Sequence, residues 1–468
     1  MDIYTVAGYN IFAKEHYRMN SSNKAELYAQ MPVAQAVVKN AVPAVISSLM
    51  VLVYNLADTF FIGQTHNALL VAAVSVATPV FLFLMAIGTL FGIGGTSVIS
   101  RALGKGDKAY ARSVCSFCFW GSVVSGVVCM VIFLAGMTPI LKLIGASSGT
   151  APYVRTYLTI VSFGSVAVVI SNAFSNILRA EGRPREAMAG MLIGNLVNIV
   201  LDPVAILWMN MGVAGAAVTT VIGNICGALY YIVFFLRGKS MLSISPKECR
   251  AGNGIFSGII FIGVPASLNT LLMNISCIIL NKLMSVYGDM AIAGIGVAMK
   301  VNMILVMFII GFAQGVQPLL GYAAGEKNWK RFRSMFGFSL ITSTVLSILL
   351  TAVCFFCCNQ IVRAFLTDQT AFSYGVHFAK VLLVSGPIFG LLFMLTNTLQ
   401  ALGAAVPSLI LSISRQGIIF IPLVFVLNKI AGLNGLVWTQ PVSDIVSSFL
   451  AVILYAFYFR KIKTYAEM

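Results

Sequence analysis

The chain has 468 residues, of which 59% are hydrophobic and only 9% are charged, and its mean hydropathy is +0.94. Soluble domains carry about 25% charged residues, so this chain has too little charge to solvate the surface of a water-soluble globule. We therefore expect an all-α polytopic membrane protein, since a lipid-exposed backbone must satisfy its own hydrogen bonds.

Apolar stretches long enough to span a bilayer, about 20 residues each, recur twelve times along the chain. In chain order they are 36–61, 68–97, 112–138, 153–178, 186–208, 212–236, 256–284, 291–319, 334–358, 374–400, 406–428 and 433–459. Two sets of six predict five parts: a cytoplasmic N-terminal segment at 1–35, an N-lobe at 36–236, a cytoplasmic loop at 237–255, a C-lobe at 256–459 and a cytoplasmic tail at 460–468.

The net charge of +16 is unevenly distributed. Lysine and arginine gather in the N-terminal segment, in alternate loops and in the tail, as at Arg101, Lys105 and Lys108 after the second span. This is the positive-inside pattern, and it favours membrane orientation over nucleic-acid binding. We expect a multi-pass protein of the plasma (cytoplasmic) membrane, with both termini in the cytoplasm, surrounded by the lipid bilayer and monomeric.

Short motifs recur between the two sets of spans at offsets of 220 to 222 residues. The recurring pairs are Val42-Pro43-Ala44 with Val264-Pro265-Ala266, Gly182 with Gly403, and Gly212-x-x-Gly215-x-x-x-Thr219 with Gly432-x-x-Gly435-x-x-x-Thr439. Duplicated hydrophobic units are how many transporters build a central site that two halves open alternately. Because each half has an even number of spans, the repeats are expected to be parallel.

Two acidic residues define a candidate cation site. Asp58 and Asp202 both fall in the outer halves of outward-running spans, where an ionisable group is expensive and is by default a functional candidate. Asn198 lies one helical turn before Asp202, and Thr220 lies at a matching depth in the next span. These oxygen ligands suit H⁺ or a small cation such as Na⁺. The alternative is that each carboxylate braces a kinked helix.

A substrate cavity is expected beside this site. Tyr54 and Asn55 precede Asp58 on the first span, and Asn172 and Asn176 stand four residues apart on the fourth. Pro43 lies on the first span as well, and we expect it to bend that helix.

Three further charged residues inside spans have two open interpretations. Asp444 follows Pro441, so a local structural role is as well supported as a functional one. Lys300 and Arg415 are expected to snorkel or to pair with backbone carbonyls, with a cavity-lining role as the alternative.

The nine cysteines form no disulfide or zinc pattern, and the chain has only three histidines. We therefore expect no catalytic residues, no cofactor and no metal beyond Na⁺ at the candidate cation site, and hence a protein that is not an enzyme.

Several of these motifs together resemble the MATE family (multidrug and toxic compound extrusion), in its DinF-like and MepA-like bacterial branch. The resemblance is carried by Asn55-Leu56-Ala57-Asp58-Thr59-Phe60-Phe61-Ile62-Gly63, Ser100-Arg101-Ala102-Leu103-Gly104, Leu178-Arg179-Ala180-Glu181-Gly182, Asn198 to Pro203, and Gly311 to Pro318. It implies a fold of two six-helix lobes and export of amphiphilic or cationic drugs and toxins, driven by inward H⁺ or Na⁺. It also places the cation site in the N-lobe at Asp58, Asn198, Asp202 and Thr220.

Two other functions stay open at this point. One is a lipid-linked saccharide flippase of the same wider superfamily, which would differ by flipping a lipid carrier without exporting drugs. The other is an intramembrane enzyme, which the sparse histidines and the absence of paired metal-ligand motifs in the spans disfavour.

Overall fold

Long helices dominate the computed structural model, which describes residues 30–65, 67–366 and 368–467. The predicted N-terminal segment up to residue 29 lies outside the described residues. The first half comprises α2 (Val33–Gly63), α3 (Ala68–Gly104), α4 (Lys108–Ala135), α5 (Met137–Leu143), α6 (Ala151–Ala180), α7 (Pro184–Asp202), η1 (Pro203–Trp208) and α8 (Val213–Leu236). After η2 (Pro246–Glu248), the second half comprises α9 (Ile255–Met284), η3 (Ser285–Tyr287), α10 (Asp289–Gly325), α11 (Trp329–Phe356), α12 (Cys358–Arg363), α13 (Gln369–Leu382), η4 (Leu383–Ile388), α14 (Phe389–Ala401), α15 (Ala405–Ile413), η5 (Ser414–Ile419) and α16 (Phe420–Glu467).

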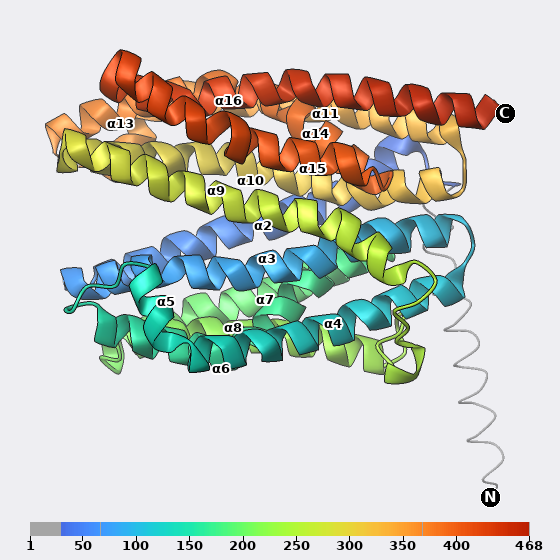
Figure 1. The fold of residues 1–468 in the computed structure, drawn as a ribbon, viewed down its shortest axis with the longest axis horizontal. Helices are drawn as coiled ribbons and strands as arrows, with labels where there is room; N and C mark the ends of the chain where they lie inside the picture. The colour runs from blue at the N-terminus through green and yellow to red at the C-terminus, as the bar shows by residue number, and fades with distance from the viewer. Residues whose placement is uncertain (1–29, 66, 367, 468) are drawn as a thin grey trace, which may run out of the picture.

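The helices form two layers (Figure 1). The blue-to-green helices α2 to α8 make one layer, and the yellow-to-red helices α9 to α16 make the other. Many outward-facing side chains are large and apolar, such as Val200, which is 64% exposed, and Ile341, which is 67% exposed. Such a surface suits lipid rather than water. The expected all-α polytopic fold is confirmed.

Eleven helical stretches of the described chain are long and apolar enough to cross a membrane, where the sequence predicted twelve spans. The difference lies in the last stretch, Ala405–Arg460, which runs for 56 residues. Gly432 interrupts it with a φ of 56° and a ψ of −131°, a backbone conformation outside the helical region. The two predicted spans 406–428 and 433–459 are therefore present as two helices joined at this glycine.

Glycines at corresponding places of the two halves adopt matching backbone conformations. Gly212 precedes α8 with a φ of 53° and a ψ of −122°, close to the values at Gly432. Gly182 lies in the turn between α6 and α7, and Gly403 lies in the turn between α14 and α15, with φ values of 81° and 74°. A positive φ is readily adopted only by glycine. The repeated sequence motifs thus correspond to repeated turns.

Close packing between the layers is concentrated toward one end of the helices. We call this the basic end, defined by the turn between Gly104 and Lys108. Gly104 lies against the backbone of Tyr322, and Gly315 lies against Ala41 of α2. In the same half of the molecule, the Ser97 hydroxyl donates to the carbonyl oxygen of Gln400 at 2.5 Å. These contacts hold the two layers against each other in this half of the molecule.

Candidate functional site

The candidate cation site is built by three helices of the first layer. Asp202 is the last residue of α7, where the chain passes into the π-helical turn η1 that starts at Pro203. Its side chain is fully buried. The hydroxyl of Thr219, on α8, lies 2.5 Å from Asp202 Oδ1. The same hydroxyl lies 3.1 Å from the carbonyl oxygen of Gly215 and 3.0 Å from that of Ala216.

Asn198 connects Asp202 to the other threonine of α8. In the amide orientation that satisfies both ends, its Nδ2 donates to Asp202 Oδ2 at 3.2 Å. Its Oδ1 accepts from the backbone N–H of Thr220 at 3.0 Å. Asn198 and Thr220 are each 2% exposed. The sequence predicted Asn198, Asp202 and Thr220 as neighbours, and the structure brings them together.

Asp58 approaches from α2. Its Oδ1 atom is buried and has no hydrogen-bond partner among the described residues. The Asp58 carboxyl lies within electrostatic range of Asp202 and of the Tyr54 hydroxyl. Tyr157 of α6 lies within range of the same groups and is 6% exposed. The arrangement is a largely buried cluster of carboxylates, hydroxyls and one amide, in which Asp58 Oδ1 has no partner among the described residues.

Sequence reasoning missed Thr219 and Tyr157. Thr219 belongs to the repeated glycine–threonine motif, but depth along the span favours its neighbour Thr220 equally well. The internal repeat holds the signal that could have identified Thr219, because Thr439 stands at the corresponding position of the second half. Thr439 bonds the carbonyl oxygen of Gly435 just as Thr219 bonds that of Gly215, and Thr219 in addition bonds the carboxylate of Asp202.

The predicted cavity amides lie apart from this cluster. Asn55 is exposed and donates to the carbonyl oxygen of Val51 at 2.8 Å. The Asn172 Nδ2 atom lies 3.4 Å from the sulfur of Met85, which belongs to α3. Asn176 accepts from Arg179, which also donates to Gln314 of the other layer. Among the described residues no hydrogen bond joins either amide of α6 to Tyr54, so their role as cavity residues stays a prediction.

Pro43 is buried inside α2, which is continuous across it. The hydroxyl of Ser47 donates to the carbonyl oxygen of Pro43 at 2.8 Å. A bend at Pro43 stays a prediction.

The charged residues of the second layer form a separate group. Arg415 Nε donates to Asp444 Oδ1 at 2.8 Å, and Gln440 donates to the same oxygen at 3.0 Å. Asp444 Oδ2 accepts from Ser385 at 3.3 Å. The pairing of Arg415 with a carboxylate differs from the expected pairing with backbone carbonyls. Lys300 lies 5.5 Å from the ring centre of Phe365, a cation–π contact.

Cysteine and histidine contribute no metal centre among the described residues, where no group of three His, Cys, Asp or Glu side chains could hold a metal ion. The nine cysteines are free thiols. The candidate site instead combines two carboxylates with hydroxyl and amide groups, a set of oxygen ligands suited to H⁺ or Na⁺.

The two carboxylates lie toward the end of the helices opposite the basic end. Ala41 and Ser48, which contact the other layer, belong to the half of α2 nearer the basic end, whereas Asp58 belongs to its other half. Asp202 likewise stands at the end of α7 away from the basic end. The carboxylates therefore lie in the half of the molecule away from the close packing between the layers.

The structure has two layers of helices that are long enough to span a membrane, and the layers are related by an internal repeat. One layer carries a buried acidic pair. Together these features define a multi-pass membrane protein with the architecture of a transporter. The chain belongs to the MatE family, whose model matches residues 43–204 and again 265–426. The resemblance to this family is thus confirmed, and the double match agrees with the internal repeat.

Named relatives and solved structures agree with this assignment. The chain is 31% identical to the multidrug export protein MepA of Staphylococcus haemolyticus (strain JCSC1435) over 91% of this chain and 94% of that protein. It is 29% identical to MepA of Staphylococcus aureus (strain MRSA252), with the same coverage. Its fold is similar to an outward-facing multidrug resistance MATE family transporter of the MOP superfamily, with a TM-score of 0.88, 23% identity, and 94% and 98% of the two chains covered. A MATE crystal structure in a straight conformation gives a TM-score of 0.87 at 24% identity, with 95% and 99% covered.

Proposed function

We propose that the chain is a secondary active multidrug exporter that exchanges amphiphilic, often cationic, organic compounds for inward H⁺ or Na⁺ by alternating access. The MatE family match and the similarity to multidrug export proteins support export of small molecules. The coupling site in this proposal is Asp58, Asn198, Asp202 and Thr220, assisted by Thr219.

The observation that carries the proposal is that the Thr219 hydroxyl can either donate to the buried Asp202 or accept a proton from it. An ionised Asp202 accepts the Thr219 proton across 2.5 Å, and the Asn198 amide satisfies its second oxygen. A protonated Asp202 instead donates to Thr219, whose own proton turns to the carbonyl oxygen of Gly215 or Ala216. A hydroxyl is both donor and acceptor, so neither state leaves this carboxyl with an unsatisfied group. Such a site can load and release a cation without unfolding.

The layer packing supplies the second support. The layers are packed tightly at the basic end, which the charge pattern predicts to be cytoplasmic. The cation site lies in the opposite half. In this proposal the structure represents the state closed to the cytoplasm, and rocking of the N-lobe (36–236) against the C-lobe (256–459) exposes the substrate cavity to each side in turn.

The test uses purified protein in proteoliposomes, with pH and Na⁺ gradients imposed separately and export of a fluorescent cationic dye as the readout. We expect one gradient to drive export in the wild type. Asp58→Asn and Asp202→Asn should abolish gradient-driven export while retaining dye binding and the wild-type melting temperature. Asp289→Asn, which neutralises an exposed carboxylate at the start of α10, is the matched control and should export normally.

Full gradient-driven export by Asp58→Asn would contradict the proposed coupling site. Flipping of a labelled lipid-linked saccharide without any dye export would favour the flippase alternative. The proposed location is the plasma membrane with both termini cytoplasmic, and the proposed state is a monomer. Labelling of Cys residues introduced near Arg460, together with a mass measurement in detergent, tests these two points.

A further inference from the structure

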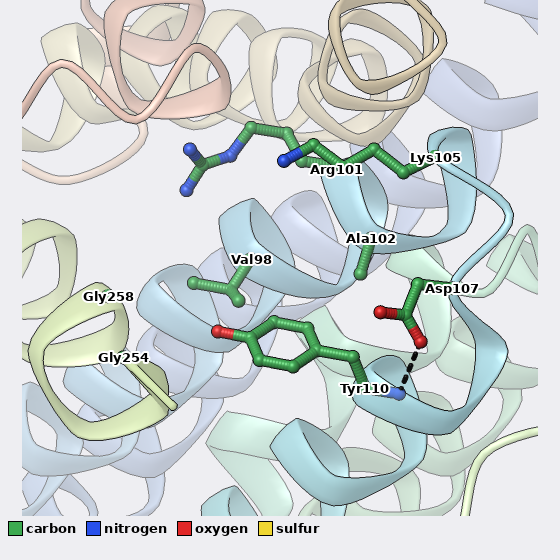
Figure 2. Close-up of a pocket in the computed structure, with 8 residues that line it drawn as sticks. All are labelled: Val98, Arg101, Ala102, Lys105, Asp107, Tyr110, Gly254 and Gly258. Atoms are coloured by element: carbon green, nitrogen blue, oxygen red, sulfur yellow. Dashed lines mark hydrogen bonds between the residues drawn. The ribbon is translucent and has the colours of Figure 1, made fainter. Parts of the chain in front are cut away.

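A pocket of about 380 Å³ lies between the two layers at the basic end. Its walls are the end of α3 with Val98, Arg101, Ala102 and Lys105, the start of α4 with Asp107 and Tyr110, and the start of α9 with Gly254 and Gly258. Figure 2 shows Arg101 and Lys105 along one side of this pocket and the two glycines at another. The pocket is remote from Asp58 and Asp202 and takes no part in the proposed coupling.

The pocket has the electrostatic character of an anion site. It is lined by two cationic side chains and one carboxylate, which leaves a formal charge of +1. Asp107 Oδ1 accepts from the backbone N–H of Tyr110 at 2.9 Å, as Figure 2 shows, and this bond holds the carboxylate at the start of α4. Lys105 is exposed. Arg101 uses Nε and Nη2 to bond Ser97, at 2.9 and 3.4 Å. Its Nη1 lies against Gly403 and makes no hydrogen bond among the described residues. Charged donors of this kind bind phosphate oxygens strongly.

The start of α9 adds to this field. Gly254 precedes the 30-residue helix with a φ of 76°, and no side chain caps the helix there. The first amides of a helix have no intrahelical acceptor and carry the positive end of its dipole. Gly254 and Gly258 have no side chains to cover this backbone. The Ile255 N–H donates to the carbonyl oxygen of Gly252 at 3.1 Å and the Gly258 N–H donates to that of Gly254 at 2.9 Å, so the amides of Phe256 and Ser257 are the ones that a ligand would reach. A group bound there would contact α3 of the first layer and α9 of the second.

We propose that this pocket binds a phosphate-type anion and that the bound anion holds the two layers together at the basic end. The positive-inside pattern predicts this end to lie at the level of the inner-leaflet headgroups, where acidic phospholipids present such a group and basic pockets between helices bind it. A soluble phosphate has the same chemistry, and the experiment separates the two sources. The proposal concerns binding and does not depend on the coupling ion.

The experiment measures thermal unfolding of the full-length protein in a neutral detergent. The added probes are inorganic phosphate, short-chain phosphatidylglycerol and short-chain phosphatidylcholine. We expect phosphatidylglycerol to raise the melting temperature in a saturable way and phosphatidylcholine to have little effect. A rise with inorganic phosphate alone would support the same pocket with a soluble anion as its occupant.

Two variants localise the effect. Lys105→Gln removes one charged donor and should weaken the apparent affinity about tenfold. Gly258→Leu keeps every charge but fills the pocket, because a Cβ at this position already lies 3.3 Å from Val98, and it should abolish the effect. Lys330→Gln is the matched control, since it removes an exposed charge at the same end of the molecule but outside the pocket.

The proposal is overturned if no anion raises the melting temperature of the wild type. It is also overturned if Lys105→Gln and Lys330→Gln respond alike, or if the rise persists in Gly258→Leu. Melting temperatures of the variants without any probe establish that each is folded.

Discussion

Gly315→Ala should loosen the closed basic end by a calculable amount. A Cβ at Gly315 would lie 2.6 Å from Ala41 Cα and 2.8 Å from the carbonyl oxygen of Asn40, both on α2. Ordinary contact begins at 3.4 Å, so the shortfall at Ala41 is 0.8 Å. Both neighbours are backbone atoms, which no rotamer change can move away. The helices α2 and α10 must therefore separate, and overpacking of this kind costs about 1–3 kcal/mol.

This cost acts on the closed arrangement, because an open basic end no longer has the contact. A shift of 1–3 kcal/mol changes the ratio of open to closed molecules about 5- to 150-fold. If about 1% of the wild-type protein is open, the variant would be open in roughly 5–60% of molecules. Spin labels at Lys105 and Lys330, one on each layer, report the change as a longer component in the distance distribution measured by pulsed electron paramagnetic resonance.

Gly337→Ala is the control, because it makes the same substitution at a position where alanine should stabilise the helix. Gly337 lies inside α11 with nothing within 4 Å of its Cβ position, so alanine there gains about 0.5–1 kcal/mol of helix stability without a clash. It should leave the distance distribution unchanged. If Gly315→Ala and Gly337→Ala gave the same distribution as the wild type, the contact between α2 and α10 would not hold the basic end closed.

Three other predictions follow from single contacts. Asp444→Asn should destabilise the protein by about 3–5 kcal/mol because it leaves Arg415 buried without its carboxylate, and the double variant Arg415→Met/Asp444→Leu should recover most of the loss in thermal unfolding. Thr219→Val should reduce gradient-driven export while Thr439→Val does not, because only Thr219 contacts a carboxylate; equal effects would assign both threonines to helix packing. Burial raises the pKa of Glu181 above its usual 4.5, so the folded state binds this proton more tightly than the unfolded state. The contribution of this group to stability therefore falls as the pH rises above 4.5. Glu181→Gln should flatten that part of the profile of melting temperature against pH.

Much of the fold was predictable because its signals are local. Apolar length fixes the spans, and the glycine pairs at 182 and 403 and at 212 and 432 mark turns that only glycine readily makes. The twelfth span appeared as part of a longer stretch only because α16 stays helical on both sides of Gly432.

The candidate site was predicted less completely because it depends on helix rotation. Successive residues of a helix point about 100° apart, since a turn takes 3.6 residues. Depth along α8 therefore selects a turn but does not decide between Thr219 and Thr220. The pairing of Arg415 with Asp444, which are 29 residues apart on two helices, depends in the same way on how those helices pack.

The two halves hold the same pair of helices together by different means. Arg415 corresponds to Gly194 at the offset of 221 residues that relates Gly182 to Gly403, and Asp444 corresponds to Asn224 at the offset of 220 that relates Thr219 to Thr439. In the first half, Gly194 and Gly223 (the residue before Asn224) bring α7 and α8 into backbone contact, since a Cβ on Gly223 would lie 2.5 Å from the carbonyl oxygen of Gly194. Such close approach places Thr219 against Asp202 without any ion pair between the helices. In the second half the buried Arg415 side chain instead pairs with Asp444 at 2.8 Å. Asp202 in the first half therefore bonds a hydroxyl and an amide, whereas Asp444 in the second half bonds a cation, and this difference supports the proposed placement of the coupling site in the first half.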